Sequence, residues 1–126
     1  MTPTLPAQRI ADAFSSHGRR AALMPYLMGG FPDVDESRAI GLACAGAGAD
    51  LVELGIPFSD PLADGPVIHA AATSALAGGV TPSAVLGVCE SLAKRIPVVL
   101  MVYSNVVLQG GGPDAFVERA ASAGAA

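Results

Sequence analysis

The stretch that decides the fold is Leu51–Gly65, which reads LVELGIPFSDPLADG. Its first residues form a short apolar run, which predicts a buried strand interrupted by the carboxylate of Glu53. The proline- and glycine-rich remainder predicts a loop that carries Asp60 and Asp64. An ionised side chain inside a buried strand costs free energy unless a cation pairs with it. The sequence holds no lysine or arginine at positions 39–93, so the unpaired Glu53 indicates chemistry rather than architecture.

Outside this stretch, strand and helix patterns alternate along the chain. Short apolar runs predict strands at Ala21–Met28, Leu51–Leu54 and Val98–Tyr103. Helical periodicity predicts helices at Leu5–Ser16, from about residue 35 to 46, at Pro66–Leu76, at Pro82–Arg95 and at Asp114–Ala123. Strands that alternate with helices predict an α/β fold with a parallel sheet and right-handed crossovers. In a barrel or an open sheet of this kind, functional groups gather at the carboxyl ends of the strands.

Two helix starts carry capping signals. Asp33 or Asp35 is placed to accept a hydrogen bond from the first turn of the second helix. Thr81 followed by Pro82 is a favourable pair for the start of the helix that runs to Arg95. These signals predict where two of the crossover helices begin.

Length and composition narrow the class of protein. The chain has 126 residues with about half of them apolar, which predicts that residues 1–126 form a single domain. A net charge of −4 argues against nucleic acid or an anionic membrane as a partner. No apolar run approaches the roughly 18 residues that span a bilayer, and no signal peptide is evident, so we expect a cytoplasmic protein. Cys44 and Cys89 are expected to be reduced core thiols, and no His or Cys cluster predicts a metal site.

Four polar side chains are candidates for function. Glu53 shares a strand face with Leu51, and a carboxyl among apolar neighbours can pass a proton near neutral pH; the alternative is an architectural carboxylate held by backbone donors. Asp64 lies in a loop that can fold back over the strand end, or it is an ordinary turn residue. Tyr103, at the end of a strand, is either a core residue with a satisfied hydroxyl or a substrate contact. Asp60 is expected to cap a turn or to form a surface contact.

The stretch Leu51–Gly65 closely resembles the signature of the tryptophan synthase α subunit family. Three further segments resemble that family: Met24–Tyr26 its first strand, Gly79–Pro82 the start of its second main helix, and Met101–Asn105 the end of its third strand. The resemblance extends over nearly the whole chain from about Ala22 onward.

This resemblance implies a (β/α)8 TIM barrel, of which this chain would cover about the first three βα units. It also implies a lyase of tryptophan biosynthesis that cleaves indole-3-glycerol phosphate to indole and glyceraldehyde 3-phosphate without a cofactor. The family's catalytic carboxylates fall on Glu53, as general acid and base, and on Asp64, which accepts the indole N–H. Two carboxylates in different environments can divide such roles.

The resemblance also implies two sets of binding residues. Tyr26, Met101 and Tyr103 match positions that line the indole pocket, and Tyr26 stands where the family often has phenylalanine. A second set, Pro57, Asp60 and Asn105, matches the surface that meets the β subunit. That partner binds pyridoxal phosphate and receives the indole through a channel.

The length of the chain differs from that of the family. A full barrel needs roughly 250 residues, and the phosphate site of such barrels usually lies in the loops after strands seven and eight. We therefore expect an N-terminal part of a larger protein, with phosphate-binding residues beyond Ala126 and negligible turnover by the 126-residue chain alone. Two alternatives remain open at this point: a non-enzymatic fragment that docks on the β subunit, and another phosphosugar-handling barrel.

Overall fold

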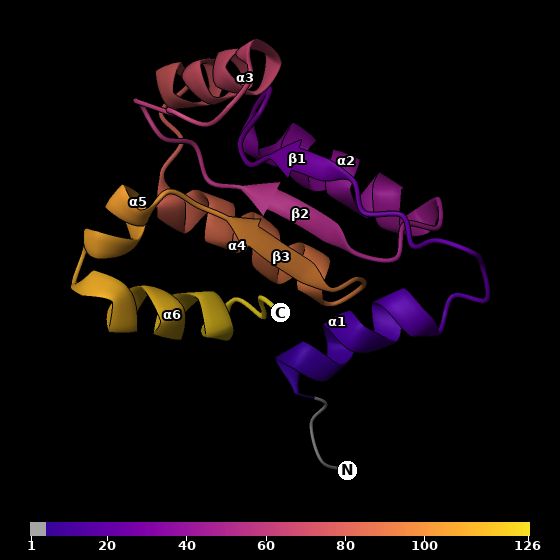
Figure 1. Cartoon of the computed structure of the whole chain (residues 1–126). Coiled ribbons are helices and arrows are strands. Elements are labelled where there is room, and N and C mark those ends of the chain that lie inside the picture. Colours follow the sequence, from indigo (N-terminus) through magenta and orange to yellow (C-terminus); the bar gives the residue numbers. More distant parts are fainter. Residues whose placement is uncertain (1–4) are drawn as a thin grey trace.

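The computed structural model describes residues 5–126, which fold around a three-stranded parallel sheet (Figure 1). The strands are β1 (Tyr26–Met28), β2 (Val52–Gly55) and β3 (Val98–Met101), in the order β1-β2-β3. In the register of the sheet, Glu53 of β2 stands between Tyr26 of β1 and Val99 of β3. The predicted parallel sheet is confirmed.

Six helices accompany the sheet within the described residues. Their bounds are α1 (Pro6–Ser15), α2 (Val34–Gly46), α3 (Pro66–Ala77), α4 (Pro82–Ala93), α5 (Ser104–Leu108) and α6 (Gly112–Ser122). Figure 1 shows α2 and α4 against one face of the sheet, α3 and α5 near the arrowheads of the strands, and α1 near the opposite end. The strand–helix order is that of successive βα units in an α/β barrel.

Both predicted helix caps are confirmed. The Asp33 carboxylate accepts a hydrogen bond from the Glu36 N–H at 2.8 Å and caps α2. The Thr81 hydroxyl accepts one from the Ala84 N–H at 3.2 Å, and Pro82 occupies the first turn of α4. Each cap satisfies an N–H group that has no partner within its helix, which stabilises a helix end by typically about 1 kcal/mol.

The core lies between the sheet and α4. Val52, Leu54 and Val98 point toward this helix and are fully buried. The residues of α4 that pack against them are Val85, Leu86, Val88, Cys89 and Leu92. Burying a valine or leucine side chain contributes about 1.5–3 kcal/mol, so this cluster holds α4 to the sheet. It also leaves the other face of the sheet free for a site.

The first strand is shorter than the sequence predicted. The prediction began at Ala21, but β1 begins at Tyr26. Pro25 has no N–H to donate to the neighbouring strand, so the regular hydrogen-bonded ladder starts only after it. The chain before Pro25 still lies beside β2, because the Leu23 carbonyl accepts the Asp50 N–H at 2.9 Å.

The segment after β3 also differs from the prediction. The third strand was expected to continue to Tyr103, but it ends at Met101 and a short helix, α5, follows. The two adjacent valines of α5 favour a strand by propensity, and the tertiary structure overrides that local preference. The last helix begins at Gly112, slightly before the predicted Asp114, with Pro113 in its first turn.

Two arginines tie α1 and the segment after it to the amino-terminal end of the sheet. The Arg9 guanidinium of α1 donates hydrogen bonds to the carbonyls of Ala93 at 2.8 Å and Gly124 at 3.2 Å. These carbonyls lie at the C-terminal ends of α4 and α6, where a cation is favourable. After α1, Arg19 forms an ion pair with Asp50, at the entry to β2.

Within residues 5–126, no single helix is long and apolar enough to cross a membrane. Helices α3 and α4 together reach the required length and composition, but they bend by 110° at the break between them.

Candidate active site

The face of the sheet opposite α4 carries the predicted site residues. Side chains that stand beside one another in the register point to the same face. Tyr26 and Glu53 are such a pair, and so are Gly55 and Met101. The strands therefore place an aromatic ring, a carboxylate and a thioether together at their carboxyl ends.

Glu53 is half-buried, with the fully buried Leu51 on the same face of its strand. Its backbone N–H donates to the Pro25 carbonyl at 2.9 Å, which fixes the start of its side chain. Among the described residues, no hydrogen-bond donor or cation contacts its carboxylate. The architectural alternative, in which backbone donors hold this carboxylate, therefore finds no support in the contacts.

Asp64 lies in the loop between β2 and α3, and it is also half-buried. The N–H of the preceding residue, Ala63, donates a hydrogen bond to the Tyr103 hydroxyl oxygen at 3.0 Å. Earlier in the same loop, the ring of Phe58 stacks on Tyr103 with centroids 5.3 Å apart and an interplanar angle of 29°. The loop thus folds back over the carboxyl end of β3, as the sequence suggested it can.

Three other predicted site residues lie close enough to Tyr26 to influence its electrostatics. Burial raises the pKa of the Tyr26 hydroxyl to about 12. The negative charge of Asp64, and then that of Glu53, raises this pKa further, because a nearby anion disfavours ionisation of the Tyr26 hydroxyl. Tyr103 makes a smaller contribution in the same direction. At neutral pH the Tyr26 hydroxyl is therefore protonated and can donate a hydrogen bond.

Gly55 gives Tyr26 its place on the sheet. A Cβ atom at Gly55 would overlap the Tyr26 hydroxyl oxygen and approach its ring carbon Cζ to 2.8 Å. The missing side chain therefore lets the Tyr26 ring lie across the end of β2, beside the two carboxylates. The remaining predicted pocket residue, Met101, has 51% of its surface exposed on this same face.

The predicted partner residues fall into two groups. Asp60 and Asn105 are exposed, and the Asp60 carboxylate accepts a hydrogen bond from the neighbouring Ser59 hydroxyl at 2.7 Å. Pro57 is buried, so its ring offers no surface to a partner in this structure. A docking surface here would be formed by Asp60 and Asn105, with Pro57 supporting the loop from beneath.

Three residues of this face and its loop were not predicted as site residues from the sequence: Phe58, Gly55 and Met28. Phe58 is an aromatic residue within a polar, proline-rich loop, and that isolation was a usable signal of a tertiary contact. Gly55 ends a strand directly before the loop, and its need for close approach was not visible without Tyr26 above it. Met28 stands beside Gly55 in the register and is buried on the same face.

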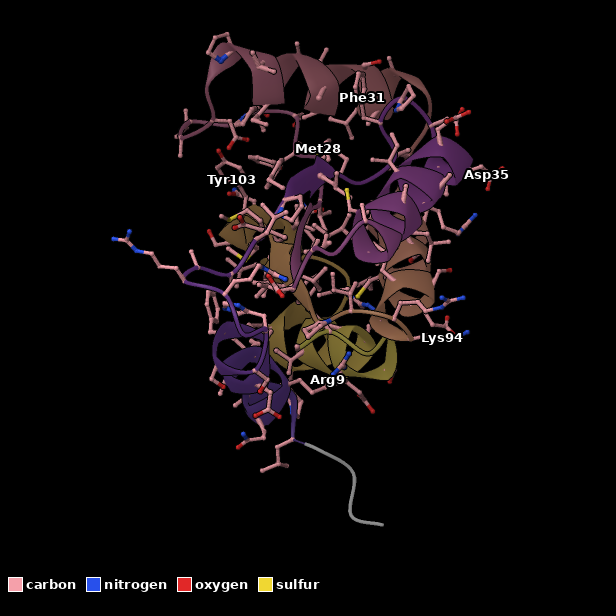
Figure 2. All side chains as sticks on the ribbon, turned by 90° about the vertical axis from the view of Figure 1, so that its right-hand side faces the viewer. Arg9, Met28, Phe31, Asp35, Lys94 and Tyr103 are labelled. Atoms are coloured by element: carbon pink, nitrogen blue, oxygen red, sulfur yellow. The ribbon has the colours of Figure 1, made fainter. Side chains whose placement is uncertain are left out.

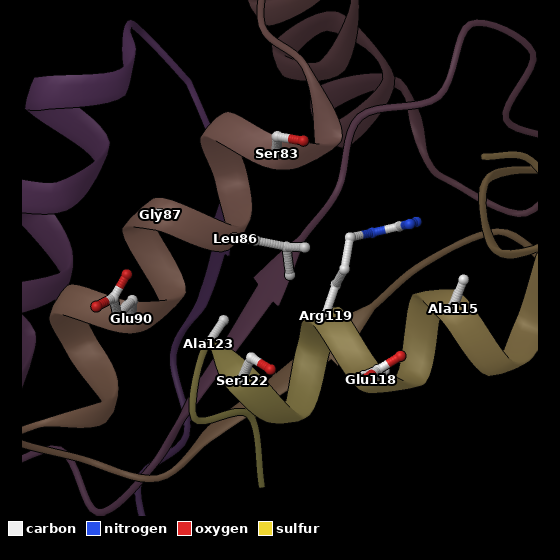
Figure 3. Close-up of a pocket in the computed structure, with 9 residues that line it drawn as sticks. All are labelled: Ser83, Leu86, Gly87, Glu90, Ala115, Glu118, Arg119, Ser122 and Ala123. Carbon is white, nitrogen blue, oxygen red and sulfur yellow. The ribbon is translucent and has the colours of Figure 1, made fainter. Parts of the chain in front are cut away.

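Neither of two cavities among the described residues is lined by Glu53 or Asp64. A groove of about 570 Å³ runs between α4 and α6 on the helical side, and Figure 3 shows Glu90, Glu118 and Arg119 along it. A smaller apolar cavity of about 220 Å³ lies along β1, between Tyr26, Phe31 and Val67. Within residues 5–126, no three metal-ligating side chains gather in one place.

A parallel sheet with helices on one face, and with two carboxylates without cation partners at the carboxyl ends of its strands, defines a chain of the (β/α) barrel class. Residues 13–126 match the family model described as tryptophan synthase alpha chain. The chain therefore belongs to the tryptophan synthase alpha chain family, and the predicted membership and the predicted TIM-barrel fold class are confirmed.

Individual relatives agree with this assignment. The tryptophan synthase alpha chain of Synechococcus sp. (strain CC9902) is 55% identical over 108 residues, which are 84% of this chain and 40% of the relative. That of Gloeobacter violaceus is 48% identical over 121 residues, 93% of this chain and 44% of the relative. The chain thus spans less than half the length of these curated relatives.

Solved structures show the same relationship. A crystal structure of tryptophan synthase from M. tuberculosis, in an aminoacrylate-bound form, superimposes with a TM-score of 0.87 at 41% identity, covering 93% of this chain and 49% of the other. Tryptophan synthase subunit alpha from Legionella pneumophila str. Paris gives a TM-score of 0.85 at 38% identity, with 93% and 46% covered.

Proposed function

We propose that this chain carries the two catalytic carboxylates of a lyase that cleaves indole-3-glycerol phosphate to indole and glyceraldehyde 3-phosphate, in tryptophan biosynthesis. The observation that carries the proposal is the placement of Glu53 and Asp64 around Tyr26, without a cation partner among the described residues. Membership of the tryptophan synthase alpha chain family supports the choice of substrate.

The proposed step is a retro-aldol cleavage. Glu53, as a general acid, transfers a proton to the indole carbon that bears the glycerol phosphate chain, and positive charge develops on the ring nitrogen. The carboxylate of Asp64 accepts the indole N–H and stabilises this charge. The adjacent hydroxyl group then loses its proton to Glu53 and becomes the aldehyde carbonyl, while the electrons of the broken carbon–carbon bond return to the ring. General acid–base catalysis of this kind contributes about 10²- to 10⁴-fold in rate.

The aromatic pocket is proposed from the same face of the sheet. Tyr26, Met101 and Tyr103 would contact the indole ring, with the ring of Tyr26 held in place by the space above Gly55. The protonated Tyr26 hydroxyl adds a hydrogen-bond donor to the site. We assign phosphate recognition to the part of the barrel that lies outside the matched region in the relatives.

The wider assignments follow from the same proposal. Residues 1–126 are a single partial-barrel domain, and the protein acts in the cytoplasm without a cofactor of its own. Its partner is the tryptophan synthase β subunit, which would supply pyridoxal phosphate, and the docking surface includes Asp60 and Asn105, which are exposed beside the site.

An indole-release assay tests the lyase. The 126-residue chain alone is expected to release almost no indole. Mixing it with the second half of the Synechococcus sp. (strain CC9902) relative, the part beyond the matched region, is expected to restore turnover; we refer to this mixture as the reassembled barrel. Failure of a folded reassembled barrel to release indole, with indole-3-glycerol phosphate supplied at saturating concentration, would contradict the proposal, as would robust turnover by the chain alone.

A pull-down with the β subunit tests the partner separately. The chain with Asp60→Lys and Asn105→Asp is expected to bind the β subunit more weakly than the unchanged chain, because both exposed positions change their charge. Equal binding would remove this surface from the proposal without affecting the lyase.

A further inference from the structure

We infer that Tyr103 is a positioning residue, which holds the loop of Asp64 over the site through its hydroxyl oxygen and its ring. From the sequence, Tyr103 was expected to be either a core residue with a satisfied hydroxyl or a substrate contact. The two contacts of its side chain reach into the middle of the Ile56–Gly65 loop, at Phe58 and at Ala63.

The loop is fixed at both ends, and its middle depends on Tyr103. At the start, the Ile56 N–H donates to the Met101 carbonyl at 3.0 Å. At the end, Gly65 is the N-cap of α3. Between these points the exposed Leu62, Ala63 and Asp60 make few contacts with the rest of the chain, so an untethered loop would sample many conformations.

Tyr103 itself stands on a rigid base. It follows β3 directly and precedes α5, and its carbonyl accepts the Val106 N–H at 3.0 Å. Its ring stacks on Phe58, and its hydroxyl oxygen accepts the Ala63 N–H from the residue next to Asp64. Because a hydrogen bond at the neighbouring peptide restricts where the Asp64 side chain can point, the position of this carboxylate follows from that of Tyr103.

The catalytic meaning of this contact rests on the proposed function. A carboxylate that must meet the indole N–H works only within a narrow range of positions, and a displacement of about 1 Å can lower a rate about 100-fold. Tyr103 would thus act through Asp64 as well as by touching the ring of the substrate.

Amide hydrogen exchange on the 126-residue chain tests the tether without any substrate. Tyr103→Phe keeps the ring that stacks on Phe58 and removes the oxygen that accepts the Ala63 N–H. We expect exchange at Ala63 to become about tenfold faster, while the amides of Val52 and Leu54 in the core are unchanged. Tyr26→Phe is the matched control, since it removes the other tyrosine hydroxyl of the site and should leave exchange at Ala63 unaltered. Unchanged exchange at Ala63 in Tyr103→Phe would overturn the inference.

A second variant covers the case in which Tyr103→Phe loosens the whole fold, which would show as faster exchange at Val52 and Leu54. Phe58→Leu keeps the hydrogen-bond acceptor and removes the aromatic stacking. It should raise exchange at Ala63 by less than Tyr103→Phe does, with the core amides unaffected. An Ala63 amide that stays as protected as in the unchanged chain would count against the ring contact.

A spectroscopic measurement separates positioning from a purely structural role. When Tyr103 is unchanged, Asp64→Asn should lower the pKa of Tyr26, because the nearby negative charge is removed. NMR of ring-labelled tyrosine measures this pKa. In the Tyr103→Phe background the same Asp64→Asn change should shift this pKa much less, because the loop has moved away. An equal shift in both backgrounds would show that Tyr103 does not position Asp64.

The lyase assay then joins the two proposals. In the reassembled barrel, Tyr103→Phe is expected to lower kcat about tenfold and to change KM little, since the ring that contacts indole is retained. If the unchanged reassembled barrel releases no indole while Ala63 exchange responds as expected, the proposed function fails and the tether stands. A normal kcat beside faster Ala63 exchange would overturn the catalytic role of Tyr103.

Discussion

Two acidic residues, Asp50 just before β2 and Glu53 within it, differ in the partners of their carboxylates. At the amino end, the Asp50 carboxylate accepts the Leu23 N–H at 2.8 Å and pairs with Arg19. Within the strand, the Glu53 carboxylate has no such partner among the described residues. Figure 2 shows the same division along the molecule, with Arg9 and Lys94 at one end of the sheet and Met28 and Tyr103 at the other.

The comparison teaches how an acid that stabilises the fold differs from an acid at the candidate site. The Asp50 carboxylate binds neighbours within the chain. The hydrogen bond from the Leu23 N–H, and then that from Arg19, hold the pKa of its carboxyl below the usual value. The carboxylate oxygens of Glu53 accept no hydrogen bond from the described residues. A group without internal partners is available to a ligand, whereas a satisfied group stabilises the fold.

The largest effect should come from removing the unpartnered acid. Glu53→Gln is expected to lower indole release by the reassembled barrel about 10²- to 10⁴-fold, because the amide cannot transfer the proton. The free energy of unfolding should not fall, since no internal contact is lost, and urea denaturation would measure it.

Asp50→Asn is the matched control for this experiment, since Asp50 flanks the same strand at its other end. It should leave the kcat of the reassembled barrel near its original value. A comparable loss of turnover in Asp50→Asn, or near-normal turnover in Glu53→Gln, would erase the distinction between the two acids.

A second experiment probes the amino end through stability. Arg9→Ala removes hydrogen bonds from a charged donor to the carbonyls of Ala93 and Gly124, so unfolding should become easier by about 1.5–3 kcal/mol. Urea denaturation followed by circular dichroism measures the change. Arg20→Ala, at an exposed arginine, is the control and should shift stability by less than about 0.5 kcal/mol. Equal shifts in the two variants would mean that α1 is not held by Arg9.

A smaller change is expected from filling the space beneath Tyr26. Gly55→Ala places a Cβ against the Tyr26 ring, so the ring must move, at a cost of about 1 kcal/mol. Adding Tyr26→Phe removes the nearest atom and should recover part of the loss. If the stability losses of Gly55→Ala and Tyr26→Phe are additive in the double variant, the two side chains do not compete for the same space, contrary to the geometry.

The smallest effect concerns the pH dependence of stability. The pKa of Asp50 is lowered in the folded chain, so its stabilising contribution is present above the ordinary aspartate pKa and is lost as pH falls through the lowered value. Asp50→Asn should therefore unfold slightly more easily than the unchanged chain at neutral pH, and the difference should shrink in strong acid. Thermal unfolding across the acid range measures it, and a gap that widens as pH falls would contradict the sign.

Much of the fold followed from local signals. Asp33 and Thr81 mark helix starts by chemistry that acts within one turn, and both caps form. The apolar runs of β2 and β3 predicted buried parallel strands, because helices cover such strands and exclude water from them. Glu53 could be chosen as a candidate because its run held no other charge.

The rest depended on contacts between distant residues. Tyr103 and Ala63 lie far apart in the sequence, and nothing near either position indicates their hydrogen bond. The ion pair between Arg19 and Asp50 likewise joins distant residues and was not predicted. The α5 helix was missed because its valines favour strands locally, and only the packed structure selects the helix.

The chain contains two tyrosines, Tyr26 and Tyr103, and no tryptophan. Both tyrosines stand at the candidate site, Tyr26 beside Glu53 in the sheet and Tyr103 in contact with the loop of Asp64. The intrinsic ultraviolet fluorescence of the protein therefore originates at this site, and the arrival of an indole ring or the release of the loop can be followed as a change in emission from the unlabelled chain.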